Sequence, residues 1–179
     1  MIVNCAELRS QFKVAITDDD HVLLPLLKAA EDKAKRYCGT VLEAEDVTEY
    51  HDGDGTDVTM LRNFPVNSVA SVYDDVDRVY AAASLIAAAD YMFESSGRLI
   101  LDALVFNIGR QNVKVTYNAG YTATAMPYDL KKAIANIAFA DYLEANGSIN
   151  MVEGDEFVYR PKKLRDEAFT ILDLFKKLV

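Results

Sequence analysis

The sequence predicts an α+β fold, with helices at both ends of the chain and a small, mainly antiparallel β subdomain between them. Two observations carry this prediction. Apolar residues recur at helical spacing over residues 17–38 and again after Pro127. From about residue 46 to residue 120 the pattern changes to short β-type segments separated by turn residues. In the sequence, predicted helices therefore precede and follow the predicted strands.

The length of 179 residues fits one domain that buries its own apolar core. We divide the predicted domain into N-terminal helices (1–45), a β subdomain (46–121) and a helical part (122–179). A loop at 147–161 interrupts the helical part.

Two helices are expected before the strands. Asn4 and Glu7 are spaced as a capping box, which predicts a short helix that ends before Lys13. Thr17, followed by three aspartates, predicts the start of a longer helix that ends at Gly39. Pro25 predicts either a kink or a regular part that starts near it.

The β subdomain is expected to contain two hairpins and two further strands. Residues 47–51 and 57–61 flank an Asp-Gly-Asp-Gly turn, and residues 91–94 and 98–102 flank Ser-Ser-Gly. The further strands are expected at 68–73 and at 113–117, the latter with clear alternation. The alanine-rich stretch 81–89 fits a helix by propensity and a strand plus turn by context, and both readings stay open.

The C-terminal helices are expected at about 128–145 and 162–178. The apolar residues of the first cover more than one stripe, which predicts neighbours on two sides. The second is amphipathic. Between them, residues 148–161 place apolar side chains on a loop, which predicts a covering partner. We therefore predict interface residues on this loop and on the last helix: Met151, Phe157, Tyr159, Leu164, Ile171 and Phe175.

Candidate catalytic residues are few. His21 and His51 are the two imidazoles, and each is interpreted as a solvated or capping residue rather than a base. Phosphate-binding loops and nucleophile elbows are absent from the sequence. Cys5 and Cys38 are interpreted as buried thiols. A structural protein without a cofactor is favoured over a hydrolase.

The alternative to a structural protein is a small ligand-binding or calcium-binding module. Its candidate site is Asp52, Asp54 and Asp57, because a hard cation prefers several oxygen ligands from a short loop. The later bidentate glutamate of an EF-hand is missing, and acidic hairpin turns are common. The prediction is therefore that no metal is bound here.

Charge and hydropathy exclude other classes. The formal net charge of -9 disfavours binding to a phosphate backbone over a broad surface. Uncharged stretches fall short of the roughly 20 residues that span a bilayer. The first residues lack the pattern of a secretory signal. Synthesis in the cytoplasm is the expectation.

An ordered set of motifs indicates a family. It comprises Thr17-Asp-Asp-Asp to Tyr37-Cys-Gly, Phe64-Pro-Val-Asn-Ser-Val, Asp90-Tyr, Gly97-Arg-Leu, Asn112 to Tyr121, and Met126-Pro-Tyr-Asp-Leu. In this order they resemble the head-to-tail connector proteins (adaptor or head-completion proteins) of tailed bacteriophages and prophages. The resemblance covers roughly residues 5–145; residues 81–89 and 148–179 are not matched to the pattern.

The resemblance implies a virion protein of the capsid–tail junction, made in the bacterial host cytoplasm. It implies a homo-oligomeric ring of about a dozen copies beneath the portal protein, which extends the DNA channel and offers a platform to the tail or its stopper protein. DNA passes through such a ring without sequence-specific binding. The resemblance implies neither an enzyme activity nor a membrane association.

Overall fold

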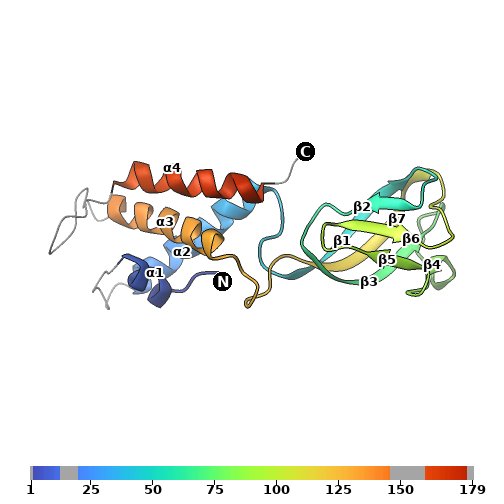
Figure 1. Ribbon diagram of the computed structural model, residues 1–179, viewed down its shortest axis with the longest axis horizontal. Coiled ribbons are helices and arrows are strands. Elements are labelled where there is room, and N and C mark those ends of the chain that lie inside the picture. Colours follow the sequence, from blue (N-terminus) through green and yellow to red (C-terminus); the bar gives the residue numbers. More distant parts are fainter. Residues whose placement is uncertain (1, 13–19, 146–159, 177–179) are drawn as a thin grey trace. The chain divides into compact units, whose positions relative to one another are not determined.

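A computed structural model describes residues 2–12, 20–145 and 160–176. The chain forms two compact units (Figure 1): unit 1 comprises Met1–Gly39 and Ala123–Val179, and unit 2 comprises Thr40–Thr122. Unit 1 is helical and unit 2 contains the strands, so the predicted α+β fold is confirmed. The assignment of both units to one domain stays a prediction.

The described residues of unit 1 form four α-helices: α1 (Cys5–Phe12), α2 (Asp20–Cys38), α3 (Tyr128–Ala145) and α4 (Pro161–Leu172). Helix α3 is its centre, because residues 133–140 are buried without interruption. α2 and α4 both pack against α3. The prediction that this helix contacts neighbours on two sides is therefore confirmed.

The helix starts follow local sequence where they are described. Glu7 donates its N–H to Asn4 Oδ1 at 2.8 Å, and Asn4 donates its N–H to Glu7 Oε2 at 3.0 Å, so the capping box forms. Helix α2 contains Pro25 and ends before Gly39, whose φ is +66°. The predicted cap at Thr17 lies outside the described residues.

The last α-helix is shorter than predicted. The sequence indicated a helix to Leu178, but α4 ends at Leu172 and a 3₁₀ turn, η2 (Asp173–Phe175), follows. At this point the Tyr37 hydroxyl donates a hydrogen bond to Asp173 Oδ1 at 2.6 Å, which fixes the tightened turn against α2. On α4, Arg165 holds Glu144 at 2.6 Å and Asp141 at 2.5 Å, and these ion pairs join α4 to α3.

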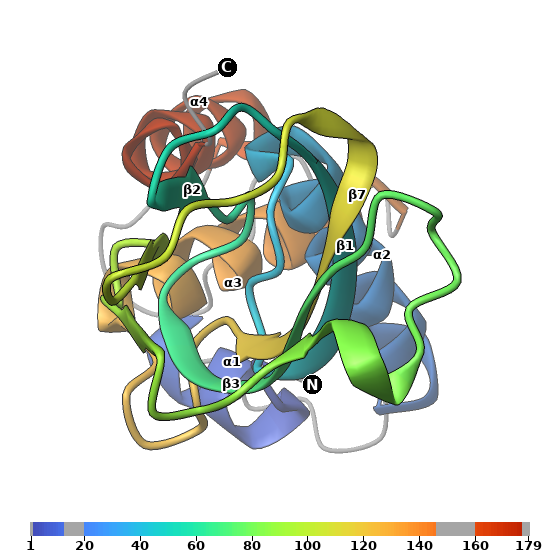
Figure 2. The ribbon, with the colours of Figure 1, turned by 90° about the vertical axis from the view of Figure 1, so that its right-hand side faces the viewer.

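Unit 2 contains two antiparallel sheets. The first has the order β1–β7–β3–β4 and the second the order β2–β6–β5. Their strands curve around a common interior (Figure 2), which buried side chains from both sheets fill, among them Val72, Leu99 and Val115. The bounds are β1 (Glu45–Gly53), β2 (Val58–Met60), β3 (Val66–Asp74), β4 (Leu85–Ile86), β5 (Tyr91–Phe93), β6 (Arg98–Leu101) and β7 (Gly109–Ala119).

One predicted hairpin is wrong and the other is confirmed. β1 extends into the Asp-Gly-Asp-Gly segment as far as Gly53. β1 and β2 lie in different sheets, because β1 pairs with β7 and β2 pairs with β6. The long partner β7 offers β1 a ladder from Glu45 to Gly53, and this pairing outweighs the local turn signal. The pair β5–β6 around Ser-Ser-Gly forms as expected.

The alanine-rich stretch 81–89 contains neither a full helix nor a full strand. A 3₁₀ turn, η1 (Ala82–Ser84), leads into the two-residue strand β4, which pairs with β3. The strand-plus-turn reading is therefore nearer to the structure. The tertiary contact with β3 decides the conformation despite the helical propensity of alanine.

Candidate functional site

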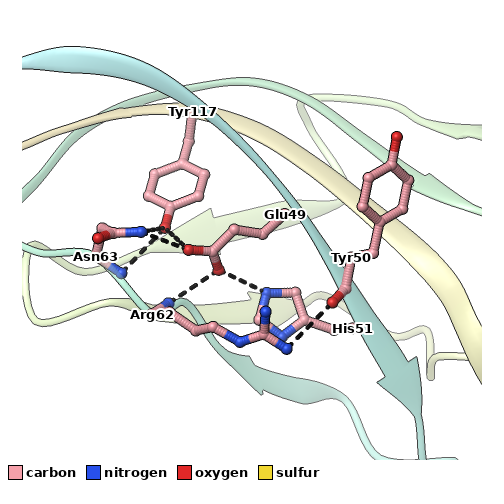
Figure 3. A network of polar contacts seen from close by, with 6 residues as sticks. All are labelled: Glu49, Tyr50, His51, Arg62, Asn63 and Tyr117. Carbon is pink, nitrogen blue, oxygen red and sulfur yellow. Dashed lines mark hydrogen bonds and ion pairs between the residues drawn. The ribbon is translucent and has the colours of Figure 1, made fainter. Parts of the chain in front are cut away.

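The interior of unit 2 contains a buried carboxylate, Glu49 of β1, which is 6% exposed (Figure 3). Tyr117 Oη donates to Glu49 Oε1 at 2.8 Å, and Asn63 Nδ2 lies 2.6 Å from the same oxygen. The backbone N–H of Arg62 donates to Glu49 Oε2 at 3.0 Å, and His51 Nε2 lies 2.9 Å from it. Both oxygens of the carboxylate therefore have two partners.

These partners decide the charge of Glu49. Burial by itself would raise the pKa of the carboxyl group, but the hydrogen bonds from His51, the Arg62 N–H and Tyr117 outweigh it and lower the pKa to about 2. Burial, together with the hydrogen bond to Glu49, raises the pKa of Tyr117 to about 12. The pair is therefore an ionised carboxylate with a neutral phenol at neutral pH.

The network fixes residues 61–63 against the strands. Asn63 donates its N–H to Tyr117 Oη at 3.1 Å, and its Oδ1 accepts the N–H of Val41 at 3.1 Å. Leu61 donates its N–H to Gly97 O at 2.8 Å, which ties the same segment to the β5–β6 turn. The buried charge of Glu49 thus connects the two sheets through the loop that follows β2. Its role in unit 2 is structural.

The structure corrects the interpretation of His51. This side chain was expected to be solvated or to cap a turn, but it is 9% exposed and lies beside Glu49. Strand alternation explains the burial, since Val47, Glu49 and His51 share one face of β1. His21 is exposed in the first turn of α2, as expected. The Glu49 carboxylate was not among the predicted site residues, although a charged residue on the inner face of an alternating strand is a signal for it.

The thiols differ from each other. Cys38 is buried as predicted, and burial together with the nearby Asp173 raises the pKa of its thiol to about 11. Cys5 is only partly buried, so that half of the prediction is wrong. It lies at the start of α1, where one side of the helix faces solvent.

The candidate metal ligands do not converge. Asp52 Oδ1 accepts the N–H of Gln111 at 2.7 Å, and Asp54 Oδ1 accepts both the N–H and the hydroxyl of Thr56 at 3.0 and 2.6 Å. Asp57 is exposed. Within the described ranges, no three His, Cys, Asp or Glu side chains are placed to hold a metal ion.

The predicted interface residues divide into two groups. Met151, Phe157 and Tyr159 lie outside the described residues. Leu164 is buried in unit 1, whereas Ile171 and Phe175 are half-buried.

In the described part of the chain, none of the helices combines the length and the apolar character needed to cross a membrane.

Comparison with known proteins decides the family. The sequence model of the head completion protein family matches residues 1–178. The chain belongs to this family. The resemblance expected from the sequence is confirmed, and membership in the head completion protein family supports the coarse function predicted, a structural part at the head–tail junction. No curated protein sequence matches the chain significantly.

Solved structures resemble the head completion protein over almost its whole length. A chain in the virion of a native gene transfer agent (GTA) particle has a TM-score of 0.65 at 19% identity, with 99% of this chain and 91% of that chain covered. A chain in the neck of an empty GTA particle, computed with C6 symmetry, has a TM-score of 0.64 at 18% identity and the same coverage. A chain in the neck of a native GTA particle, computed with C12 symmetry, has a TM-score of 0.62 at 20% identity, with 97% and 88% covered. At these identities the likeness shows a shared fold.

Proposed function

We propose that this protein is a non-enzymatic structural subunit of the head–tail junction of a tailed phage or prophage particle. In this role, copies of the chain form a ring of about a dozen subunits beneath the portal, extend the DNA channel and complete the head for attachment of the tail or a stopper protein. The observation that carries the proposal is the family match over residues 1–178.

Three further observations support it. Two of the similar chains come from the necks of GTA particles computed with C6 or C12 symmetry, and cyclic symmetry is what a ring requires. The buried carboxylate Glu49 has all its partners within unit 2, so its role is to hold the fold. The formal charge of -9 fits a passage through which DNA slides without adhering.

The alternative, a calcium-binding module at Asp52, Asp54 and Asp57, has no observation in its favour. The first two carboxylates already accept backbone N–H groups. The Asp54 carboxylate therefore stabilises its own turn and the Asp52 carboxylate holds Gln111, and in the described part of the chain no three His, Cys, Asp or Glu side chains are placed to hold a metal ion.

The direct test is attachment to heads. Heads that bear the portal are purified from a strain in which the gene is deleted, and the purified protein is added to them. We expect the protein to sediment with these heads and to restore tail joining when tails are added. Heads assembled without the portal are the control. If the protein does not sediment with portal-bearing heads, and if deletion leaves tail joining intact, the proposal is wrong.

A further inference from the structure

Three loops of unit 2 meet at one of its ends. They comprise residues 53–57, 74–80 and 102–108, and we call them the loop tip. Phe106 donates its N–H to Thr56 O at 2.9 Å, and Asn107 donates its N–H to Asp74 Oδ2 at 2.7 Å. In Figure 1 these loops follow β1, β3 and β6 at the end of unit 2 next to β4. The loop tip is therefore one continuous surface.

The loop tip exposes large apolar side chains. Their exposed fractions are 59% for Val76, 72% for Val79, 47% for Leu104, 61% for Val105 and 79% for Ile108. Leu104 and Val105 also line a shallow hollow together with Leu85, which is 47% exposed. Turn residues are ordinarily Gly, Pro, Asn, Asp or Ser, so branched aliphatic side chains gathered at a loop end mark an interaction surface.

A buried polar framework holds these loops in place. The Asn112 side chain is 0% exposed; its Oδ1 accepts the Gly53 N–H at 2.9 Å, and its Nδ2 donates to Asp74 Oδ1 and Asn107 O at 2.9 and 2.7 Å. One amide thus connects all three loops. Because the loops are fixed before binding, docking does not have to order them, which favours affinity.

The charge of the loop tip is strongly negative. The three loops contain six aspartates and one basic residue, Arg78. The whole of unit 2 has 13 Asp or Glu and five Lys or Arg residues, a formal charge of -8 out of the chain's -9. Asp54, Asp57, Asp77 and Asp102 are exposed on the same three loops as the apolar side chains. A partner that covers these side chains must therefore approach a negatively charged surface.

We propose that the loop tip docks on another protein of the head–tail junction, into an apolar pocket bordered by Lys and Arg side chains. This inference rests on the proposed function. The apolar side chains supply contact area at the centre, and the aspartates pair with the basic border and speed the encounter. A nucleic acid is disfavoured because its phosphates repel the aspartates. The same loop tip of a second copy is disfavoured because the aspartates of the two tips would repel each other.

The test compares three proteins in the assay of heads and tails described above. The double variant Val105→Asp/Ile108→Asp puts charge into the apolar centre, and both side chains are exposed, so the fold should tolerate it. Met60→Asp, at an exposed site of unit 2 outside the loop tip, is the control (Met60 is 54% exposed, against 61% for Val105). We expect the double variant to lower head binding or tail joining about tenfold or more, with Met60→Asp near wild type.

Salt provides the second readout. Head binding or tail joining by the wild type should weaken between about 50 mM and about 300 mM sodium chloride, and Asp77→Asn/Asp102→Asn should reduce this dependence. Wild-type levels of both steps in the double variant would overturn the proposal, and so would an equal loss in Met60→Asp or an effect confined to self-association. Failure of the wild type itself to bind heads, with tail joining intact after deletion, would instead contradict the proposed function.

Discussion

Replacement of Glu49 by Gln is expected to lower the free energy of unfolding by about 3 kcal/mol at pH 7. The buried carboxylate accepts hydrogen bonds from Tyr117, Asn63, Arg62 and His51. The side-chain amide of Gln has only one acceptor oxygen. Its NH₂ group would replace the second carboxylate oxygen and would face two hydrogen-bond donors, which would then lack an acceptor. Urea unfolding followed by circular dichroism measures the loss.

The pH dependence of stability identifies the carboxylate itself. The pKa of Glu49 is about 2 in the folded protein against the ordinary 4.5, so the unfolded chain binds more protons between these values. The stabilisation is complete above about pH 4.5 and is lost as the pH falls toward 2. The wild type should therefore lose up to about 3 kcal/mol over this window that Glu49→Gln does not lose.

Glu94→Gln is the matched control. Glu94 pairs with Arg98 at 3.1 Å, and both side chains are 47% exposed. Exposed ion pairs of this kind contribute only about 0.5 kcal/mol. A loss in Glu49→Gln no larger than in Glu94→Gln, or a parallel pH profile of wild type and Glu49→Gln, would contradict the structural role assigned to the network.

Gly120→Ala is expected to destabilise the protein by about 3 kcal/mol. Gly120 has a φ of +102°, and a Cβ atom built on it would lie 2.7 Å from Glu43 O and 3.0 Å from Ala44 N. This backbone contact is part of the joint where the chain leaves β7, since Tyr121 donates its N–H to Leu42 O at 3.0 Å. Thermal unfolding measured by calorimetry gives the change.

Gly39→Ala distinguishes the two causes of the expected loss at Gly120, which are the backbone strain of a positive φ and the steric clash of the added Cβ atom. Gly39 also has a positive φ, +66°, but a Cβ atom there would have no neighbour within 4 Å. It should therefore cost only the backbone strain, about 1 kcal/mol. Equal effects of the two substitutions would show that the close approach of residues 43 and 44 to Gly120 does not matter.

Local patterns predicted the parts of the fold that depend on neighbouring residues. The capping box at Asn4 and Glu7, the end of α2 at Gly39 and the β5–β6 hairpin all form. Each rests on interactions within a few residues. The alternation around β7 likewise predicted a half-buried strand, and Val113, Val115 and Tyr117 are buried.

Long-range pairing decided the features that were predicted wrongly. The Asp-Gly-Asp-Gly turn has a strong hairpin signal, yet β1 pairs with β7 more than fifty residues away. Partner choice in a sheet depends on the whole ladder, which a turn motif does not encode. The Glu49 network was missed for the same reason, because its donors come from residues 51, 62, 63 and 117.

The interface predictions illustrate a different limit. Leu164, which was predicted at an interface, is buried within unit 1, and the interface itself stays a prediction. An amphipathic helix shows which face is covered but not by what. The apolar loop tip was missed because its members come from separate loops. No short window of sequence contains both Val79 and the pair Val105 and Ile108.

Reconstruction of the portal vertex tests the central claim most directly. Electron cryo-microscopy of particles that contain the wild-type protein should show a cyclic ring of this fold, about a dozen copies, between portal and tail. The same vertex in particles from the deletion strain should lack that density and the tail. A wild-type vertex without this fold, or an unchanged vertex after deletion, would contradict the account.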